Sequence, residues 1–143
     1  MKAVDTNILV YAHRAEMPRH EQARTILDGL VRSGEPWALP WPCVYEFLRV
    51  VTHPRAFRPP TPTWMAWENM LALMASRGTV LIGPTSRHAA ALARLLRDPG
   101  LRGNDIFDAH IAALVVEHGV TTLITGDRRM RRFDGVRTQH PFD

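Results

Sequence analysis

Acidic side chains stand directly after apolar segments at several points of the sequence, where burying a charge is costly. Asp5 follows the apolar residues 3–4, Glu46 lies in what we expect to be the first turn of the helix after WALP, and Asp127 follows TTLITG. Carboxylates that share one crevice repel each other and ionise together only if protons or a cation compensate. A hard divalent cation is the simplest compensation, so these positions predict a metal site if the fold unites them.

A fourth acid belongs to a predicted helix over residues 104–119. Asp108 begins a run in which inward-facing residues recur at i, i+3, i+4 and i+7, so its side chain belongs to the buried side near the helix start. Asp105 lies three residues earlier on the same side and is a further candidate ligand. Several carboxylates without clustered Cys or His suit Mg²⁺ or Mn²⁺ better than Zn²⁺.

Each acid also has an ordinary structural explanation. Asp5 could be only a helix cap, Glu46, Asp105 and Asp108 could oppose helix dipoles, and Asp127 could be a turn residue. The signal is therefore the shared location of the acids rather than any single one of them.

Three neutral polar side chains accompany the acids. Thr6 and Asn7 can hydrogen-bond the Asp5 carboxylate or a metal-bound water, although helix capping would explain both equally well. Thr125 can bind a water or a phosphate from a strand end, although an ordinary strand-end threonine is an equal alternative.

The elements that must position these residues alternate along the chain. Short apolar runs predict strands, and helical spacing predicts helices over residues 8–12, 19–33, 42–53, 64–75, 87–98 and 104–119. Four prolines in PRAFRPPTPT predict a loop. This alternation predicts an α/β fold, a single domain over residues 1–143, in which a mostly parallel sheet lies between helices. The functional crevice of such a sheet lies outside the carboxyl ends of the strands, where the acids fall.

Composition narrows the class of protein. A chain of 143 residues, 45% of them apolar, fits one domain with an ordinary core. The lone Cys43 excludes an internal disulfide and favours a reducing cytoplasm, and no apolar run approaches membrane-spanning length. Setting the four acids aside leaves ten acids against 18 basic residues, which suits a polyanionic partner. Candidate contacts to a phosphate backbone are Arg128, Arg129, Arg131 and Arg132, with Arg49, Arg55 and Arg58 as a second group.

The ordered set MKAVDTNILVYA, VYEFLRVVTHPRAF, DAHIAALVVEHG and TTLITGDRRMRRF resembles the PIN-domain ribonucleases, and most closely the VapC toxins of bacterial toxin–antitoxin pairs. The resemblance covers essentially the entire chain and implies an α/β/α sandwich with an acidic pocket. By motif, Asp5, Glu46, Asp108 and Asp127 look like the family's acidic quartet. Family membership implies that Asp5 and Asp108 bind the metal directly and that the other two acids bind it directly or through water.

The resemblance also implies an activity and partners. The expected activity is endonucleolytic cleavage of RNA by a water that Mg²⁺ or Mn²⁺ activates, leaving 5′-phosphate and 3′-hydroxyl ends. The expected partners are RNA, a second copy of the chain and a cognate VapB-type antitoxin. The helix of this antitoxin would sit in apolar grooves of the helices over residues 19–33 and 63–75, while its tail would block the acidic pocket. Thr6 and Asn7 match the family's DTN-like opening and Thr125 its strand-end hydroxyl. Two positions depart from the pattern: Met130 replaces a common further acid, and Asp105 is an acid where relatives are commonly uncharged.

Other classes of protein stay open at the level of sequence. A catalytically degenerate PIN-like module that binds RNA or protein would keep the acids without the activity. A metal-free ribonuclease would pair two imidazoles, but the seven histidines share no visible constellation. A phosphoacceptor domain would need a strand-end lysine, whereas the only lysine is Lys2. A haloacid-dehalogenase-like phosphatase would need an aspartate where Asn7 stands.

Overall fold

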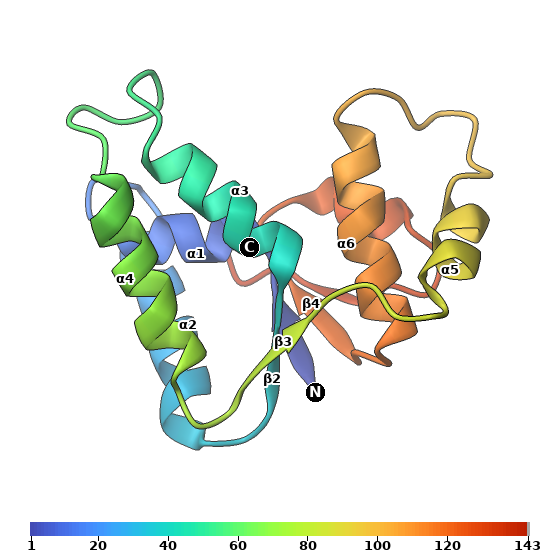
Figure 1. The fold of residues 1–143 in the computed structure, drawn as a ribbon, viewed down its shortest axis with the longest axis horizontal. Helices are drawn as coiled ribbons and strands as arrows, with labels where there is room; N and C mark the ends of the chain where they lie inside the picture. The colour runs from blue at the N-terminus through green and yellow to red at the C-terminus, as the bar shows by residue number, and fades with distance from the viewer. Residues whose placement is uncertain (143) are drawn as a thin grey trace.

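A computed structural model describes residues 1–142 of the chain as a sheet of five parallel strands with helices on both sides (Figure 1). The strands are β1 (Lys2–Val4), β2 (Trp37–Pro40), β3 (Thr79–Ile82), β4 (Thr122–Ile124) and β5 (Thr138–Gln139). The helices are α1 (Thr6–His13), α2 (His20–Ser33), α3 (Trp41–Val51), α4 (Thr63–Met74), α5 (His88–Leu95), α6 (Asp105–Glu117) and the 3₁₀ helix η1 (Arg128–Arg132).

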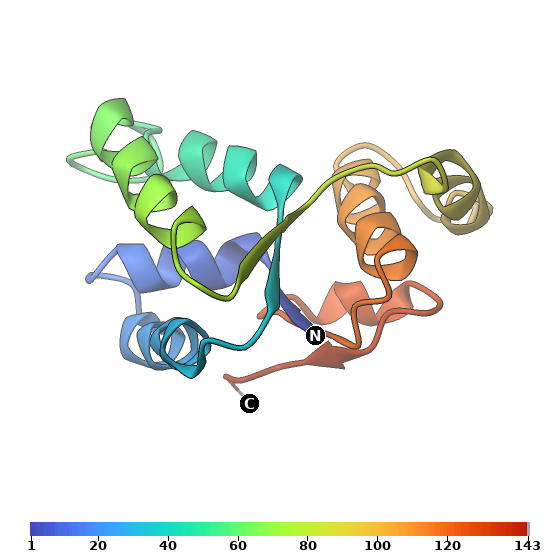
Figure 2. The ribbon, with the colours of Figure 1, turned by 60° about the horizontal axis from the view of Figure 1, so that its bottom comes forward.

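The strand order explains how the helices divide into two layers. The order is β3-β2-β1-β4-β5, so the chain steps outward from β1 to β3 and then returns past β1 to β4. Right-handed crossovers in these two directions place their helices on opposite faces of the sheet. Accordingly, α1 to α4 lie on one side, and α5, α6 and η1 lie on the other (Figures 1 and 2). The predicted α/β/α sandwich with a parallel sheet is confirmed.

The central strands are buried on both faces, which is why their sequences are continuously apolar. Val4 of β1, Leu39 of β2 and Ile124 of β4 expose at most 2% of their surface. Helix residues close the core from either side, among them Ile8, Leu9, Phe47, Ile111 and Leu114.

The strand order also fixes where a ligand can approach the sheet. β1 and β4 are neighbours with Val4 opposite Ile124, and the chain leaves their carboxyl ends toward opposite faces of the sheet. Such a switch point leaves a crevice between the two outgoing connections. The backbone N–H of Asp5 donates to the Ile124 carbonyl at 2.9 Å, so the first acid stands directly at this switch point.

Two parts of the structure differ from the sequence prediction. α3 begins at Trp41 directly after β2, so Glu46 lies in its second turn, and the expectation of a first-turn position was wrong. The physical reason is that no loop separates strand from helix: Pro40 ends β2 and Pro42 already occupies the first turn. The sequence pattern predicted neither η1 nor β5. Within residues 1–142, no helix combines the length and apolar character needed to span a membrane.

Candidate active site

Asp5 is a buried carboxylate held by three N–H and O–H donors. It caps α1, accepting from the Thr6 N–H at 2.7 Å, and also accepts from the Thr125 hydroxyl at 2.7 Å and the Asn7 amide at 3.4 Å. Only 6% of the residue is exposed. Burial raises the pKa of Asp5 from 3.8 to about 6, against the lowering effect of the Thr125 and Thr6 hydrogen bonds. Its ionised form therefore has a cost that a cation would offset.

Asn7 and Thr125 tie the end of β4 to the start of α1. The Asn7 amide donates to the Thr125 hydroxyl at 3.2 Å and accepts from the Gly126 N–H at 2.8 Å. Thr125 in turn accepts from the Asp127 N–H at 3.0 Å. A Cβ at position 126 would lie 3.0 Å from the Phe142 ring and 3.3 Å from Asn7 Oδ1, so glycine favours the close approach of the two segments. This network fixes Asp5 and Asp127 relative to each other.

Glu46 reaches the site from α3. Its Oε2 accepts from the Thr6 hydroxyl at 3.0 Å, and its Oε1 lies 3.9 Å from Arg49 Nη2. Thr6 therefore serves two acids at once, because its backbone N–H holds Asp5 and its hydroxyl holds Glu46.

Asp105 and Asp108 stand in the first turn of α6. Burial, then the nearby Asp127 charge, raise the pKa of Asp108. Asp105 lies 2.9 Å from Arg132 Nη2 and accepts from the Arg102 N–H at 3.1 Å, and the Arg132 hydrogen bond lowers the pKa of Asp105. The structure thus pairs Asp105 with an arginine instead of turning it toward Asp5.

Asp127 caps η1. Its carboxylate accepts from the Arg129 N–H at 2.9 Å and from Arg129 Nη2 at 2.9 Å. These hydrogen bonds from the Arg129 side chain, which outweigh burial, lower the pKa of Asp127.

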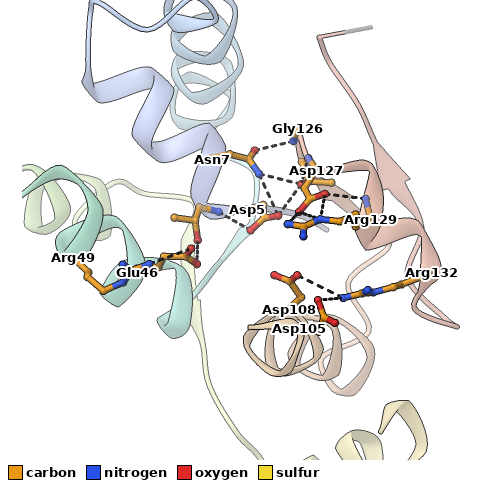
Figure 3. Close-up of polar contacts among 12 residues, drawn as sticks. Asp5, Asn7, Glu46, Arg49, Asp105, Asp108, Gly126, Asp127, Arg129 and Arg132 are labelled. Atoms are coloured by element: carbon orange, nitrogen blue, oxygen red, sulfur yellow. Dashed lines mark hydrogen bonds and ion pairs between the residues drawn. The ribbon is translucent and has the colours of Figure 1, made fainter. Parts of the chain in front are cut away.

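The fold brings the acids of the predicted quartet to one place. Figure 3 shows Asp5, Asp108 and Asp127 pointing toward one another, with Glu46 reaching in from α3. The acids lie close enough for their charges to interact, because Glu46 and Asp108 both raise the pKa of Asp5. The acids come from four separate segments, and the shared location that the sequence suggested is therefore present in the structure.

The donor chemistry of this place fits Mg²⁺ or Mn²⁺. Within residues 1–142, no three His, Cys, Asp or Glu side chains already enclose a metal-sized position. Mg²⁺ does not require such a cage, because it keeps several waters and uses one or two carboxylates. The pKa values of Asp5 and Asp108 are both raised, so ionising either carboxylate has a cost that a nearby cation would offset.

The structure adds contacts that sequence did not indicate. The Cys43 thiol, fully buried, lies 3.9 Å from Asp5 Oδ1, and its position three residues before Glu46 on α3 was the available signal. Met130 is fully buried in the core, which explains why an acid is absent there. His88 and His110, which showed no pattern in sequence, have ring centroids 5.2 Å apart between α5 and α6.

Comparison with known proteins agrees with this architecture. The model of the PIN domain family matches residues 2–136. Ribonuclease VapC43 of Mycobacterium tuberculosis is 41% identical over 143 residues, covering 100% of this chain and 97% of that protein. Ribonuclease VapC37 of the same species is 36% identical over 141 residues, covering 99% and 97%. The structure of VapBC2 from Rickettsia felis, bound to a DNA fragment from their promoter, superposes with a TM-score of 0.69 at 18% identity, covering 96% of each chain.

Proposed function

The chain belongs to the PIN domain family, and from that membership we propose that it is a divalent-metal-dependent endoribonuclease, the toxin of a VapBC-type toxin–antitoxin pair. Residues 1–143 would form one PIN-like ribonuclease domain that acts in the cytoplasm. The substrate class is RNA, and the reaction is hydrolysis of a phosphodiester by an activated water.

One observation carries this proposal. Asp5, Glu46 and Asp127 are linked by hydrogen bonds through Thr6, Thr125 and Asn7, although they stand up to 122 positions apart in the chain. Asp108 faces them from α6 (Figure 3). A fold that merely needed helix caps would have no reason to unite these acids, since desolvated like charges repel.

The residues of this chain have distinct roles in the proposed reaction. Asp5 and Asp108 would hold the cation, which supplies an acidified water and neutralises charge on the phosphate when it is bound. Thr125 and the Thr6 N–H fix the orientation of the Asp5 carboxylate. Glu46, oriented by the Thr6 hydroxyl, and Asp127 would orient the attacking water and accept its proton.

A groove on the other side of the sheet from α6 fits the proposed antitoxin. It has a volume of about 270 Å³ and lies between α1, α2, α3 and α4. Its apolar lining includes Leu9, Leu27, Val31, Phe47 and Leu73, which suits the apolar face of a helix. The charged rim includes Arg24 and Asp28. A second copy of the chain is the other expected protein partner.

The proposal is tested by mapping RNA ends. Purified protein is incubated with bulk bacterial transfer and ribosomal RNA in Mg²⁺, and new 5′-phosphate ends are counted by sequencing. We expect discrete cuts that EDTA abolishes and that excess Mg²⁺ restores. Asp5→Asn and Glu46→Gln should each lower the cleavage rate by about 100-fold or more.

Glu35→Gln is the matched control. Glu35 is exposed and precedes β2, at the amino ends of the strands, whereas the acids lie at the carboxyl ends. This change therefore removes one carboxylate without touching the site. Cuts that persist in EDTA and end in cyclic phosphates would instead favour the His88 and His110 pair. Binding of RNA without any cleavage by the parent protein would favour the degenerate module.

A further inference from the structure

The 3₁₀ helix η1 directs two arginines to the acids. A 3₁₀ helix has three residues per turn, so side chains at i and i+3 lie above one another. Arg129 and Arg132 therefore share one face of η1, and Figure 3 shows both on the side of the acids. Met130 between them is fully buried in the core and anchors the helix.

Arg132 is fixed more firmly than a surface arginine usually is. Its Nη2 lies 2.9 Å from Asp105 Oδ1, and its guanidinium carbon lies 5.0 Å from the centre of the Phe133 ring. The Arg132 side chain is only 29% exposed. Asp105 is itself held in place, because it accepts from the Arg102 N–H at 3.1 Å. The side chain is thus positioned before any ligand arrives.

Arg132 and Arg129 contact their neighbouring carboxylates in different ways. Arg129 gives Nε and Nη2 to both oxygens of Asp127, and its side chain is 68% exposed. Arg132 approaches Asp105 through Nη2 at 2.9 Å, and the same Nη2 lies 3.8 Å from Asp108 Oδ2, beyond hydrogen-bond distance. The guanidinium of Arg132 carries two further donor nitrogens, Nε and Nη1, and lies beside Asp108, an acid that faces the site.

We propose that Arg132 binds a non-bridging oxygen of the phosphodiester that is cleaved, and that Asp105 is a positioning residue that aims it. This inference rests on the proposed ribonuclease function. A planar guanidinium matches phosphate oxygens, and their charge grows as the attacking oxygen adds to phosphorus. Asp105, which sequence placed among candidate metal ligands, would then act through Arg132 and leave the cation to the other acids.

The competing explanation is that Arg132 only balances the charge of Asp105 and Asp108. Removing a balancing arginine would leave the cleavage rate unchanged or raise it, because the cation would meet less repulsion. Removing a phosphate ligand would lower the maximal rate while the cation binds at least as tightly. The two explanations therefore predict opposite results.

The experiment measures single-turnover cleavage at a site mapped in bulk bacterial RNA, as a function of protein concentration. For Arg132→Ala we expect the maximal rate to fall about 100-fold, with the half-saturating concentration changed less than about threefold. Arg132→Lys, which keeps the charge but not the planar fork, should fall between. Asp105→Asn keeps an oxygen for the Arg102 N–H and should lower the maximal rate about tenfold.

Arg77→Ala is the matched control, since Arg77 is exposed and precedes β3 at the amino ends of the strands, away from the acids. It removes the same charge and should keep the parental maximal rate. Calorimetry with Mn²⁺ should show binding to Arg132→Ala as tight as to the parent. A maximal rate for Arg132→Ala within threefold of Arg77→Ala, or a loss explained by lost Mn²⁺ binding, would overturn the inference. Parental cleavage that survives EDTA or Asp5→Asn would instead refute the proposed function.

Discussion

The burial of Asp5 makes its ionised form costly for the stability of the fold, although the proposed reaction needs that charge. It is almost fully buried next to the Cys43 thiol and within reach of the charges of Glu46 and Asp108. The hydrogen bonds from Thr6, Thr125 and Asn7 reduce the cost of its charge but do not remove it, because its pKa stays raised. Buried carboxylates with perturbed pKa values close to other acids are typical of functional sites.

Replacing Asp5 should therefore stabilise the fold while abolishing activity. A pKa raised from 3.8 to about 6 means that the folded chain holds its proton longer than the unfolded chain. Stability then falls as pH rises through this window, by up to about 3 kcal/mol. Asp5→Asn removes that loss, so in EDTA it should be more stable than the parent at pH 7 and similar at pH 4.

Urea denaturation at pH 4, 5, 6 and 7 measures this difference directly. The other titrating groups, including Asp108 with its raised pKa, are present in both proteins and largely cancel in the comparison. Added Mg²⁺ should stabilise the parent at pH 7 more than Asp5→Asn, because only the parent keeps the full ligand set. Stability curves that run parallel across the whole pH range would contradict the burial argument.

At the scale of elements, Glu117 joins α6 to the segment before α5. The residue is 6% exposed, its Oε1 accepts from the Thr85 N–H at 2.7 Å, and its Oε2 lies 2.6 Å from His88 Nδ1. Its backbone carbonyl accepts from Arg87 Nη2 at 2.6 Å. Burial opposes ionisation, but the hydrogen bonds from Thr85 and His88 outweigh it and lower the pKa of Glu117.

Glu117→Gln should therefore weaken the packing of α5 on α6. We expect a loss of about 1–3 kcal/mol in the free energy of unfolding at pH 7, because a charged acceptor with two donors is replaced. A group whose folded pKa is lowered stabilises the fold above its ordinary pKa of 4.5, and that contribution disappears as pH falls below it. The difference between variant and parent should accordingly shrink toward pH 3.

Urea denaturation measures the effect, and Glu68→Gln is its control. Glu68 is an exposed residue of α4, where the same change should cost less than about 0.5 kcal/mol. Equal losses in the two variants would show that the Glu117 contacts contribute nothing specific.

The elements differ in how far sequence could predict them. Short apolar runs identified β1 to β4, and helical spacing identified all six α-helices. Gly34 and Gly119, both with positive φ, follow the ends of α2 and α6. β5 has two residues and η1 consists of arginines around one methionine, so neither carries a repeating apolar pattern. Tertiary contacts decide such elements: Met130 is buried, and β5 pairs with β4.

The site was predictable to a similar extent. The positions of the acids at strand ends follow from topology, so sequence could anticipate their meeting. The partners of the acids depend on side-chain directions, and sequence assigned Arg129 and Arg132 to RNA without indicating that each also faces an acid. The juxtaposition of His88 and His110 likewise depends on how α5 packs against α6.

At the scale of the whole molecule, RNA and the helix of the proposed antitoxin are expected to meet different surfaces. The acids and η1 lie at the carboxyl ends of the strands, where the arginines of η1 stand close to the acids. The groove between α1, α2, α3 and α4 is lined mainly by apolar side chains and carries none of the four acids. RNA cleavage and antitoxin binding should therefore be separable by mutation.

The change Leu73→Glu tests that separation. Leu73 is partly buried and lines the groove, so a carboxylate there would have to be desolvated against the apolar face of the antitoxin helix. We expect binding of the cognate VapB-type protein, measured by calorimetry, to weaken at least tenfold, roughly the effect of losing one interface hot spot. Leu71→Glu is the matched control on the same helix, because Leu71 is 45% exposed and does not line the groove. Both variants should cut RNA at the parental rate, and only Leu73→Glu should escape inhibition by the antitoxin. Equal antitoxin affinity in the two variants would place the antitoxin on another surface of the molecule.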